Sequence, residues 1–565
     1  MGRWFDVGWV ILWGAVSSAW CLSAARDLSA TFDEPFYLEA GLGSWHSGSN
    51  NDLMRKGTMP LPVDVEYLPI YVWERCRGVP FDRVRDFHTI LPYARAANLV
   101  FWWLLLIYGT LLARRFGGAW AGRFAVVLLA TEPNFLGHAC LATTDISVTA
   151  LLLAFAFHYE LGRGRGRFRR WVVPGALYGL AIAAKASALT FAPLIVLGLE
   201  LPNWYWAGLF RPAAGVGRWR HLWRGTANFR FDAAKSFAIA TVVLWVYCGC
   251  DWKPQPSFVK WAAKLPDDGW RDRMSWLATN LTVFPNAGEG LMYQVKHNIR
   301  GHDGVYLLGE WHVKKAVWYY FPVALTIKLS VPVLMLMAML ALRPRTLATP
   351  LTLVAVLLLL FSLNCRVQIG IRLMFPLVSF LILVIAVGLA RAIAGLRPVR
   401  QYIALLMAAI AVWIPAVMTW PDGIRYANEL WGGPNELYRF LGDSNDDWGQ
   451  GVIDLDQWTA DRGLPPAVIW YYGLDPTITK DLTRVLPLHD DRYNIREPAD
   501  TRKHVAGKVV AVSLTLRFSN PRVTPTMETP VEFFADQAPI GRSRSFVIYD
   551  FRKLTPPNEN GRGAP

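Results

Sequence analysis

Charged residues border long apolar segments of the sequence at four sites, and their types suit the transfer of a group from a phosphate. The sites hold Asp33 with Glu34, then Asp145, Lys185 and Arg372. A charge at a membrane boundary is costly, so each one that does not anchor a loop is a candidate functional residue. Each site also has a structural interpretation, with the carboxylates as helix N-caps and the cations as anchors that reach the lipid headgroups.

Two cations and one carboxylate base are sufficient to move a sugar from a phosphate to a hydroxyl. The phosphate leaves as an anion that Lys or Arg can pair with, so no acid is needed to protonate it. The acceptor hydroxyl needs a carboxylate that removes its proton. Glycoside hydrolysis differs, because its alcohol leaving group calls for two cooperating carboxylates.

The hydrophobic residues are arranged in blocks that predict a polytopic α-helical membrane protein. The 565 residues are 53% hydrophobic and include 27 Trp, and the mean hydropathy is +0.24. Such values lie outside the range of soluble proteins. Apolar runs at 94–112, 316–342, 351–363, 373–390 and 403–417 suit spans, which take about 20 helical residues each. The formal charge of +15 lies in short basic tracts between spans, which favours membrane lipids over nucleic acid as the partner.

The basic tracts also predict the orientation of the chain. With the N-terminus in the cytoplasm and about eleven spans, nearly every short basic loop is cytoplasmic, as the positive-inside rule requires. Loops 26–92 and 251–315 and everything after 420 are then outside the inner (cytoplasmic) membrane. The first apolar segment, 7–25, is expected to stay as a span, with a cleaved signal peptide as the alternative. Segment 171–205 crosses either once or twice.

The composition changes abruptly after 420 and divides the chain into two expected domains. Residues 1–420 form the transmembrane domain. Residues 421–554 are polar, with β-rich runs at 467–472, 508–516 and 545–551 between turn signals, which predicts a small outer α/β domain. The tail, 555–565, is expected to be disordered.

Eight short strings of residues carry a resemblance to a known family. They are Phe32-Asp33-Glu34, Glu132-Pro133-Asn134-Phe135-Leu136-Gly137-His138, Thr143-Thr144-Asp145, Lys185-Ala186-Ser187-Ala188-Leu189, Gly301-His302, Tyr306-Leu307-Leu308-Gly309-Glu310, Trp318-Tyr319-Tyr320-Phe321-Pro322 and Gly442-Asp443-Ser444-Asn445-Asp446-Asp447-Trp448-Gly449-Gln450. The chain resembles, along most of its length, the membrane glycosyltransferases of the C superfold, which include protein O-mannosyltransferases and the aminoarabinose transferase of lipid A. The last string is typical of a bacterial mannosyltransferase-like subgroup.

The resemblance implies an inverting transfer of a hexosyl, mannosyl or pentosyl group from a polyprenyl-phosphate donor to a hydroxyl of a protein, lipid or glycan. Asp33 would be the catalytic base, Glu34 its neighbour and Asp145 a second acid. The donor phosphate would bind Lys185 and Arg372, although the family's Tyr-Arg-His string is not kept around this arginine.

Positions in the outer loop 251–315 extend the implied site. His302 and Glu310 match family positions and are expected to contact substrate. His302 with His297 and His312 could suggest a metal, but their spacing is not a recognised ligand pattern. No metal and no other cofactor is therefore expected. The carboxylates at 443–447 are interpreted as a turn and a helix N-cap.

Two other classes of protein compete with a transferase. A transporter of a lipid-linked or anionic substrate also has polar residues at broken helices, but it commonly shows similar halves, and no internal repeat is visible. A membrane scaffold with a partner-binding outer domain is the second. A transferase should gather Asp33, Asp145, Lys185 and Arg372 around one outer cavity open to lipid, whereas a transporter should place its polar groups near mid-membrane.

Overall fold

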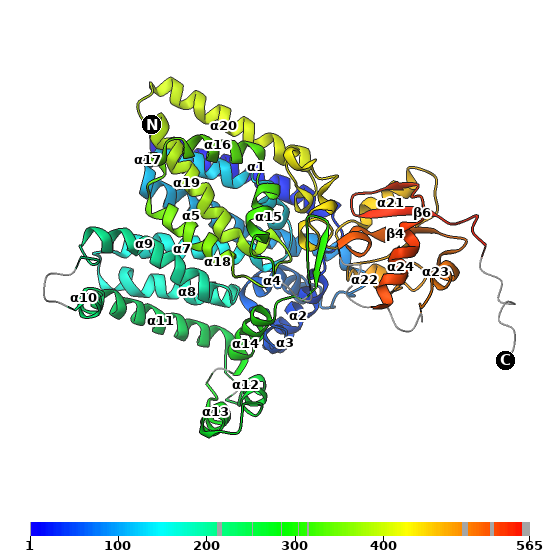
Figure 1. The fold of residues 1–565 in the computed structure, drawn as a ribbon, viewed down its shortest axis with the longest axis horizontal. Coiled ribbons are helices and arrows are strands. Elements are labelled where there is room, and N and C mark those ends of the chain that lie inside the picture. Colours follow the sequence, from blue (N-terminus) through cyan, green and yellow to red (C-terminus); the bar gives the residue numbers. More distant parts are fainter. Residues whose placement is uncertain are drawn as a thin grey trace.

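The chain forms a large helical bundle joined to a small mixed sheet (Figure 1). The computed structural model describes residues 2–211, 217–250, 252–283, 285–302, 304–313, 316–488, 495–519 and 525–555. The predicted disordered tail lies outside the described residues from 556 onward.

The bundle is built mainly from long apolar helices. These are α1 (Gly2–Asp27), α5 (Phe87–Ala130), α7 (Thr144–Gly162), α8 (Val173–Ala184), α9 (Ala188–Trp206), α11 (Ala227–Cys248), α15 (Tyr320–Lys328), α16 (Val331–Ala341), α18 (Pro350–Ser362), α19 (Phe375–Ile393) and α20 (Pro398–Thr419). Buried α19 packs against α5 at the centre. The other helices of this part of the chain are α2 (Glu34–Ser47), α3 (Asn51–Arg55), α4 (Pro60–Arg77), α6 (Pro133–Ala139), α10 (Arg218–Gly225), α14 (Pro285–Arg300) and α17 (Pro344–Leu347).

The apolar helices confirm the predicted polytopic class, while the number of spans stays a prediction. Among the described residues, five helices are long and apolar enough to cross a membrane, and seven if each of two bent pairs is one span. Helix α5 extends beyond the predicted apolar run 94–112 and has a non-helical residue at Gly118, where two helices join at a kink. Segment 171–205 is divided into two helices, α8 and α9, which meet at Lys185.

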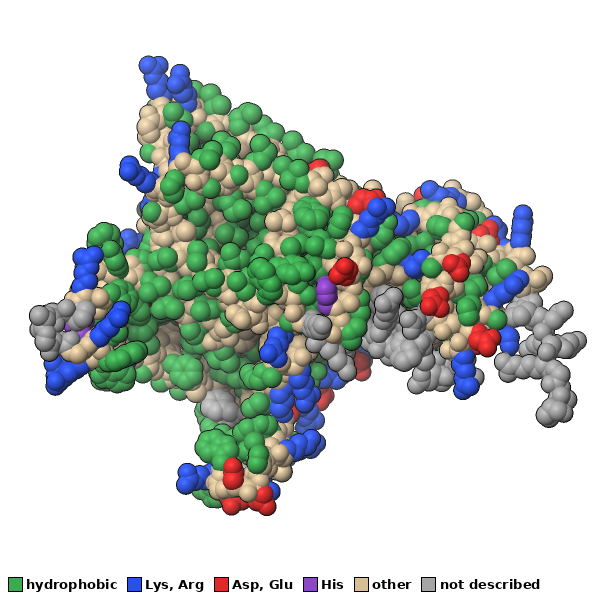
Figure 2. Space-filling view, viewed as in Figure 1, with side chains coloured by type: hydrophobic (Ala, Val, Ile, Leu, Met, Phe, Trp, Pro, Cys, Tyr) green, Lys and Arg blue, Asp and Glu red, His purple; other side chains and the backbone are tan. Residues whose placement is uncertain are grey.

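The two ends of the bundle differ in their content of basic side chains. Figure 1 shows the N-terminus, α10 and α17 at one end and the sheet at the other. Lysine and arginine side chains gather at the first end, and a broad apolar surface lies between the two ends (Figure 2). The basic loops therefore share one side of the apolar band, as the predicted topology requires.

Cysteine labelling in intact cells tests which side is cytoplasmic. In a background without the exposed Cys76, Trp219→Cys in α10 is expected to react with an impermeant thiol reagent only after lysis, because its side chain, 85% exposed, would face the cytoplasm. Leu482→Cys, at a site 82% exposed beside the sheet, is the control and should react without lysis. Labelling of Trp219→Cys in intact cells would reverse the orientation.

The predicted β-rich runs after 420 each contain a strand. The sheet has the order β3 (Val468–Trp470), β4 (Val509–Ser513), β6 (Phe546–Asp550), β5 (Gly541–Arg542), with only β3 and β4 parallel. Strand β4 is buried along its whole length, as expected of a central strand covered on both faces. The helices nearby are α21 (Val452–Ala460), α22 (Pro476–Thr479), α23 (Pro498–Val505) and α24 (Pro525–Ala535).

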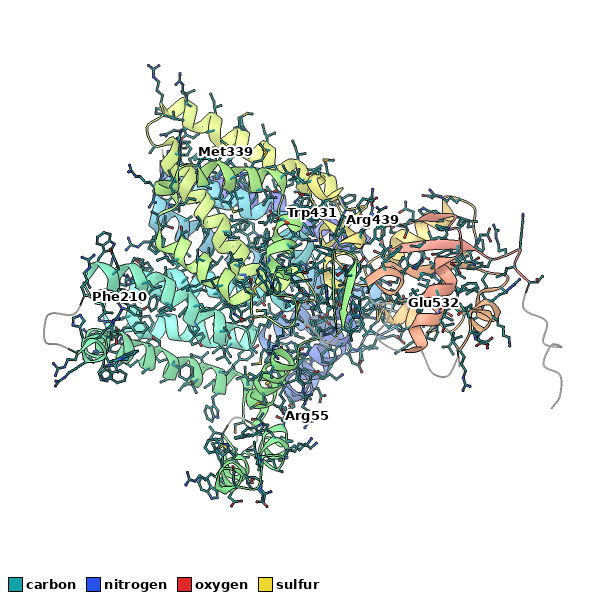
Figure 3. The ribbon with its side chains drawn as sticks, in the orientation of Figure 1. Arg55, Phe210, Met339, Trp431, Arg439 and Glu532 are labelled. Carbon is teal, nitrogen blue, oxygen red and sulfur yellow. The ribbon has the colours of Figure 1, made fainter. Side chains whose placement is uncertain are left out.

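The bundle and the sheet meet through a segment of short turns. Figure 3 places Trp431 and Arg439 at this junction, where the ring of Trp431 lies 5.2 Å from that of Phe440. A hairpin of β1 (Gly304–Leu307) and β2 (Glu310–Val313) joins the junction through a bridge between Leu307 and Leu441. The end of the bundle that faces the sheet is thus covered by polypeptide from several distant parts of the sequence.

Candidate active site

The four predicted sites converge because each lies at a helix end. Asp33 directly precedes α2, Asp145 is in the first turn of α7, and Lys185 follows the last residue of α8. Arg372 lies in the 3₁₀ turn Ile371–Met374, which leads into α19. These ends lie at the side of the bundle where the sheet is attached. Proline at the start of α2 and α19 fits this arrangement, because Pro suits the first helical turn.

Arg372 joins the two carboxylates into one cluster. Its Nη1 atom lies 3.3 Å from Asp145 Oδ2 and 3.5 Å from Asp33 Oδ2. Lys185 Nζ donates to the other oxygen of Asp145 at 2.5 Å. The structure therefore brings all four residues together, with two cations and two carboxylates in one group.

Asp33 is the more accessible of the two carboxylates. It occupies the N-cap position of α2, yet its side chain makes no capping hydrogen bond, so the capping interpretation of Asp33 is wrong. The side chain is 30% exposed. Burial raises the pKa of Asp33 above its ordinary value, and Arg372 opposes this, while the charges of Asp145 and Asp443 raise the pKa further.

Asp145 is buried and its two oxygens are both engaged. Its side chain is 1% exposed, whereas that of Lys185 is 22% exposed. The predicted N-cap role of Asp145 is wrong, because Thr143 occupies that position and Asp145 lies two residues later, within the first turn. The arrangement suits a residue that holds both cations in place.

The segment 443–450 forms the support on which Arg372 rests. The guanidinium lies 3.9 Å from the ring centroid of buried Trp448, and Arg372 Nε donates to Ser444 Oγ at 2.9 Å. The segment also holds the loop that carries Asp33, since the backbone amide of Phe32 donates to Trp448 O at 2.8 Å. Stacking and a hydrogen bond together fix the plane of the guanidinium.

The interpretation of 443–447 as a turn and helix N-cap is half right. Asp443–Asn445 is a 3₁₀ turn, but the next helix starts only at Val452, after Gly451. The carboxylates have other partners: Asp446 pairs with Arg425, and Asp447 accepts hydrogen bonds from Ser513 and Thr515. The segment therefore links the bundle to the sheet.

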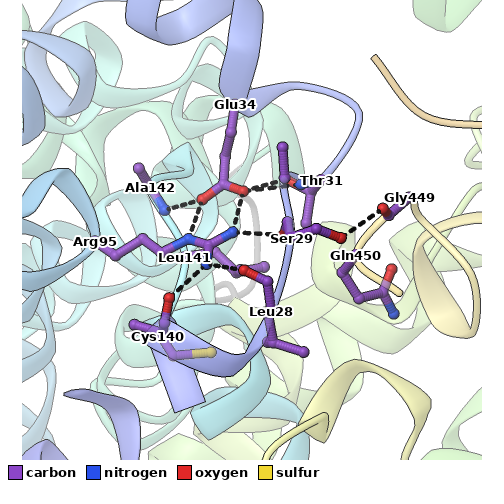
Figure 4. A network of polar contacts seen from close by, with 12 residues as sticks. Leu28, Ser29, Thr31, Glu34, Arg95, Cys140, Leu141, Ala142, Gly449 and Gln450 are labelled. Atoms are coloured by element: carbon purple, nitrogen blue, oxygen red, sulfur yellow. Dashed lines mark hydrogen bonds and ion pairs between the residues drawn. The ribbon is translucent and has the colours of Figure 1, made fainter. Parts of the chain in front are cut away.

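Glu34 differs from Asp33 because its carboxylate is fully occupied (Figure 4). Arg95 Nε and Nη2 donate to its two oxygens at 2.8 and 2.7 Å. The amides of Thr31 and Ala142 donate to Glu34 as well, each at 2.9 Å. Arg95 and Glu34 are 1% and 0% exposed. Glu34 is thereby held away from any substrate, between the loop of Asp33 and the loop before Asp145.

Arg95 is a central residue that the sequence interpretation missed. Besides Glu34, its guanidinium binds the carbonyl oxygens of Ala25, Leu28 and Ser29 at the end of α1, at 2.7 to 2.8 Å. Its place at the edge of an apolar run was a usable signal, because a charge there is a functional candidate by default.

A cavity of about 300 Å³ opens beside the cluster, and Asp145, Lys185 and Arg372 line one part of it. The rest of its wall is mixed, with apolar side chains from α7, α9, α14, α18 and α19 and the polar ends of Thr190 and Gln294. Asp33 is not in this wall and contacts Arg372 instead. The cavity thus combines two cations of the cluster and a third cation, Arg366, with a wall that is partly apolar.

A second, smaller cavity of about 60 Å³ lies on the outer side, lined by His302, Trp311, Gln368 and Asp443 among others. Glu310 starts β2, is exposed, and is absent from the linings of both cavities. The ring of His302 is 5.7 Å from that of His297. A search of the described part of the chain finds no group of three His, Cys, Asp or Glu side chains that could hold a metal ion.

Comparison with known proteins gives structural neighbours only. No protein-family model and no curated protein matches the sequence. ArnT from Cupriavidus metallidurans, in crystal structures bound to undecaprenyl phosphate and in the apo state, is 15% identical, with a TM-score of 0.47 over 96% of this chain and 97% of that chain. The Archaeoglobus fulgidus oligosaccharyltransferase, crystallised with zinc and sulfate, is 14% identical, with a TM-score of 0.40 over 75% of this chain and 54% of that one. All these TM-scores lie below 0.5, so the function below rests on the site.

Proposed function

We propose that this protein is an inverting glycosyltransferase that moves a sugar from a polyprenyl-phosphate donor to a hydroxyl acceptor on the outer side of the membrane. The convergence of Asp33, Asp145, Lys185 and Arg372 beside a partly apolar cavity carries this proposal. The cations in the cavity wall suit a phosphate, and its apolar side chains suit a prenyl chain that arrives from the bilayer.

In the proposed transfer each residue has a role that its contacts support. Asp33 removes the proton of the acceptor hydroxyl, whose oxygen forms a bond to the anomeric carbon. The bond from that carbon to the phosphate oxygen breaks, and its electron pair leaves with the phosphate. Lys185 and Arg372 pair with the departing anion, so it needs no proton. Attack opposite the phosphate inverts the anomeric centre. Asp145 and Glu34 act as positioning residues.

The position of the cluster favours a transferase over the alternative transporter. Every member lies at a helix end on the side where the sheet is attached (Figure 1). A transport site is expected near the bilayer midplane, where discontinuous helices meet. The same proposal includes the orientation of the chain in an inner membrane, with the N-terminus in the cytoplasm and the sheet on the outer side.

Loss of either cation is expected to weaken binding of the polyprenyl phosphate. Removing one charge-assisted contact costs roughly 1.5–3 kcal/mol, so Kd should rise about 10- to 150-fold in Lys185→Ala and in Arg372→Ala. Titration of the purified protein in nanodiscs with a polyprenyl phosphate measures this. Arg439→Ala, which removes an outer cation with a 61% exposed side chain, is the control. Unchanged affinity in both site variants would make these cations anchors.

The raised pKa of Asp33 predicts an acid limit of activity. The base works as a carboxylate, so the rate should fall as pH drops through a value above the ordinary aspartate pKa of about 3.9. Asp443→Asn removes one negative charge that raises the pKa of Asp33, and Asn tolerates the positive φ of 55° found there. The acid limb of kcat/KM should therefore move to lower pH. An unmoved or upward-shifted limb would contradict Asp33 as the titrating base.

The sugar and the acceptor require a direct assay. Membranes that contain the protein are supplied with a panel of hexosyl, mannosyl and pentosyl polyprenyl phosphates, and transfer to protein, lipid and glycan fractions is measured. Transfer that depends on a polyprenyl-phosphate sugar supports the proposed function. Transport of the intact donor across the membrane without sugar transfer would contradict the proposed function and support the transporter instead.

A further inference from the structure

Helices α12 (Pro256–Ala262) and α13 (Gly269–Asn280) project sideways from the bundle. Figure 1 shows them at the lower edge, near the level at which α11 ends, and away from the sheet. Helix α13 packs against α12, and α12 packs in turn against α14. We call residues 252–283 the paddle. Its position is lateral to the apolar band, not beyond it.

The paddle exposes four tryptophan side chains. Trp252, Trp270 and Trp276 are 62%, 55% and 67% exposed, and Trp261 is 37% exposed. Burial of rings of this size is strongly favourable in water, and so many exposed indoles mark an interaction surface. The ring of Trp252 also lies 6.2 Å from that of Trp245 in the last turn of α11. The exposed indoles thus begin at the end of an apolar helix.

The charges of the paddle show that it does not cross the membrane. Lys260, Asp267, Asp268, Arg271 and Asp272 lie on the same short helices and their connection. Charged side chains of both signs need water or headgroups, whereas indole rings prefer the boundary between headgroups and acyl chains. This combination fits the interface of a bilayer.

We propose that the paddle docks on the outer leaflet of the surrounding bilayer, with its exposed tryptophans in the interfacial layer of phospholipid. Because the paddle projects sideways from the bundle, it would lie against the lipid that surrounds the protein. Headgroups there would compete with a water-soluble partner for the same surface. The docking has a structural consequence, because α14, on which α12 packs, supplies Leu291, Gln294 and His297 to the wall of the large cavity. Docking of the paddle would then fix the position of α14, and with it one wall of the cavity, relative to the lipid headgroups. This consequence, and the assignment of the leaflet as the outer one, rest on the proposed function.

Spin labels in nanodiscs of neutral phospholipid test the docking. Nitroxides are attached to Trp276→Cys and, separately, to Trp261→Cys, in a background without Cys76, and collisions with oxygen and with a water-soluble nickel chelate are compared. Val246→Cys, 67% exposed on α11, and Leu482→Cys, 82% exposed beside the sheet, provide the lipid and water references. At both paddle sites, the ratio of oxygen to nickel collisions is expected to shift from the Leu482 value toward the Val246 value.

The outcomes separate lipid from the other occupants. A ratio equal to that of Leu482 at both sites would leave the paddle in water and overturn the proposal. Low access to both reagents would show a protein cover, such as a second copy of the chain, and would overturn it too. Two label sites keep the test valid if one variant fails to fold. The measurement uses no donor and no acceptor, so it stands apart from the test of glycosyl transfer.

Discussion

Asp33→Asn is expected to lower the rate of sugar transfer at least ~10²-fold, because the amide cannot take the proton of the acceptor hydroxyl. Asparagine keeps the size of the side chain and caps a helix about as well as aspartate. The variant should therefore fold, insert and bind polyprenyl phosphate as the wild type does. Initial rates with purified protein, together with the nanodisc titration, measure both properties.

A matched control separates loss of the base from loss of any nearby carboxylate. Asp27 is exposed at the last position of α1, shortly before Asp33 in the sequence. Asp27→Asn should keep its activity. If Asp33→Asn transferred sugar at the wild-type rate, the base would lie elsewhere, and Asp145 would be the next carboxylate to test.

Arg95→Met is expected to destabilise the protein by about 3–5 kcal/mol, since it leaves the buried carboxylate of Glu34 without its cation. The variant also leaves three carbonyl oxygens at the end of α1 without donors. Unfolding of the purified protein in a reversible detergent titration measures the change in free energy.

A double-mutant cycle shows whether the ion pair itself is responsible. In Arg95→Met with Glu34→Gln, no unpaired charge stays buried, so the combined loss should be smaller than the sum of the two single losses. Arg439→Met is the control for arginine removal. It breaks an exposed pair with Glu436, and such pairs contribute only about 0–1 kcal/mol. Additive losses at residues 34 and 95 would show that the pair is not coupled.

The sequence predicted the main site because charge beside apolar sequence is a local signal. Asp33, Asp145, Lys185 and Arg372 could each be recognised from neighbouring residues, and the alternation of basic loops placed them on one face. The strands after 420 were also predicted from a local signal, the β-rich runs of sequence. Helix ends were predicted less well, since the sequence left open whether segment 171–205 crosses once or twice, and the break between α8 and α9 appears only in the structure.

The residues that the sequence interpretation missed act through contacts distant in the chain. Arg95 is 61 positions from Glu34, and Ser444 is 72 positions from Arg372. Nothing local separates an arginine that anchors a loop from one that binds a buried carboxylate. For the same reason the sequence did not show that Glu34 is buried against Arg95 whereas the adjacent Asp33 is partly exposed.

The segment 443–450 limits how this protein can be rearranged. It belongs to the outer part of the chain by sequence, yet it supports Arg372 and binds the backbone of the Asp33 loop. The outer part is therefore not a detachable module. A chimaera that exchanged everything after 420 with another protein would also replace the segment that supports Arg372. A chimaera that keeps its function would therefore have to take segment 443–450 and Arg372 from the same protein.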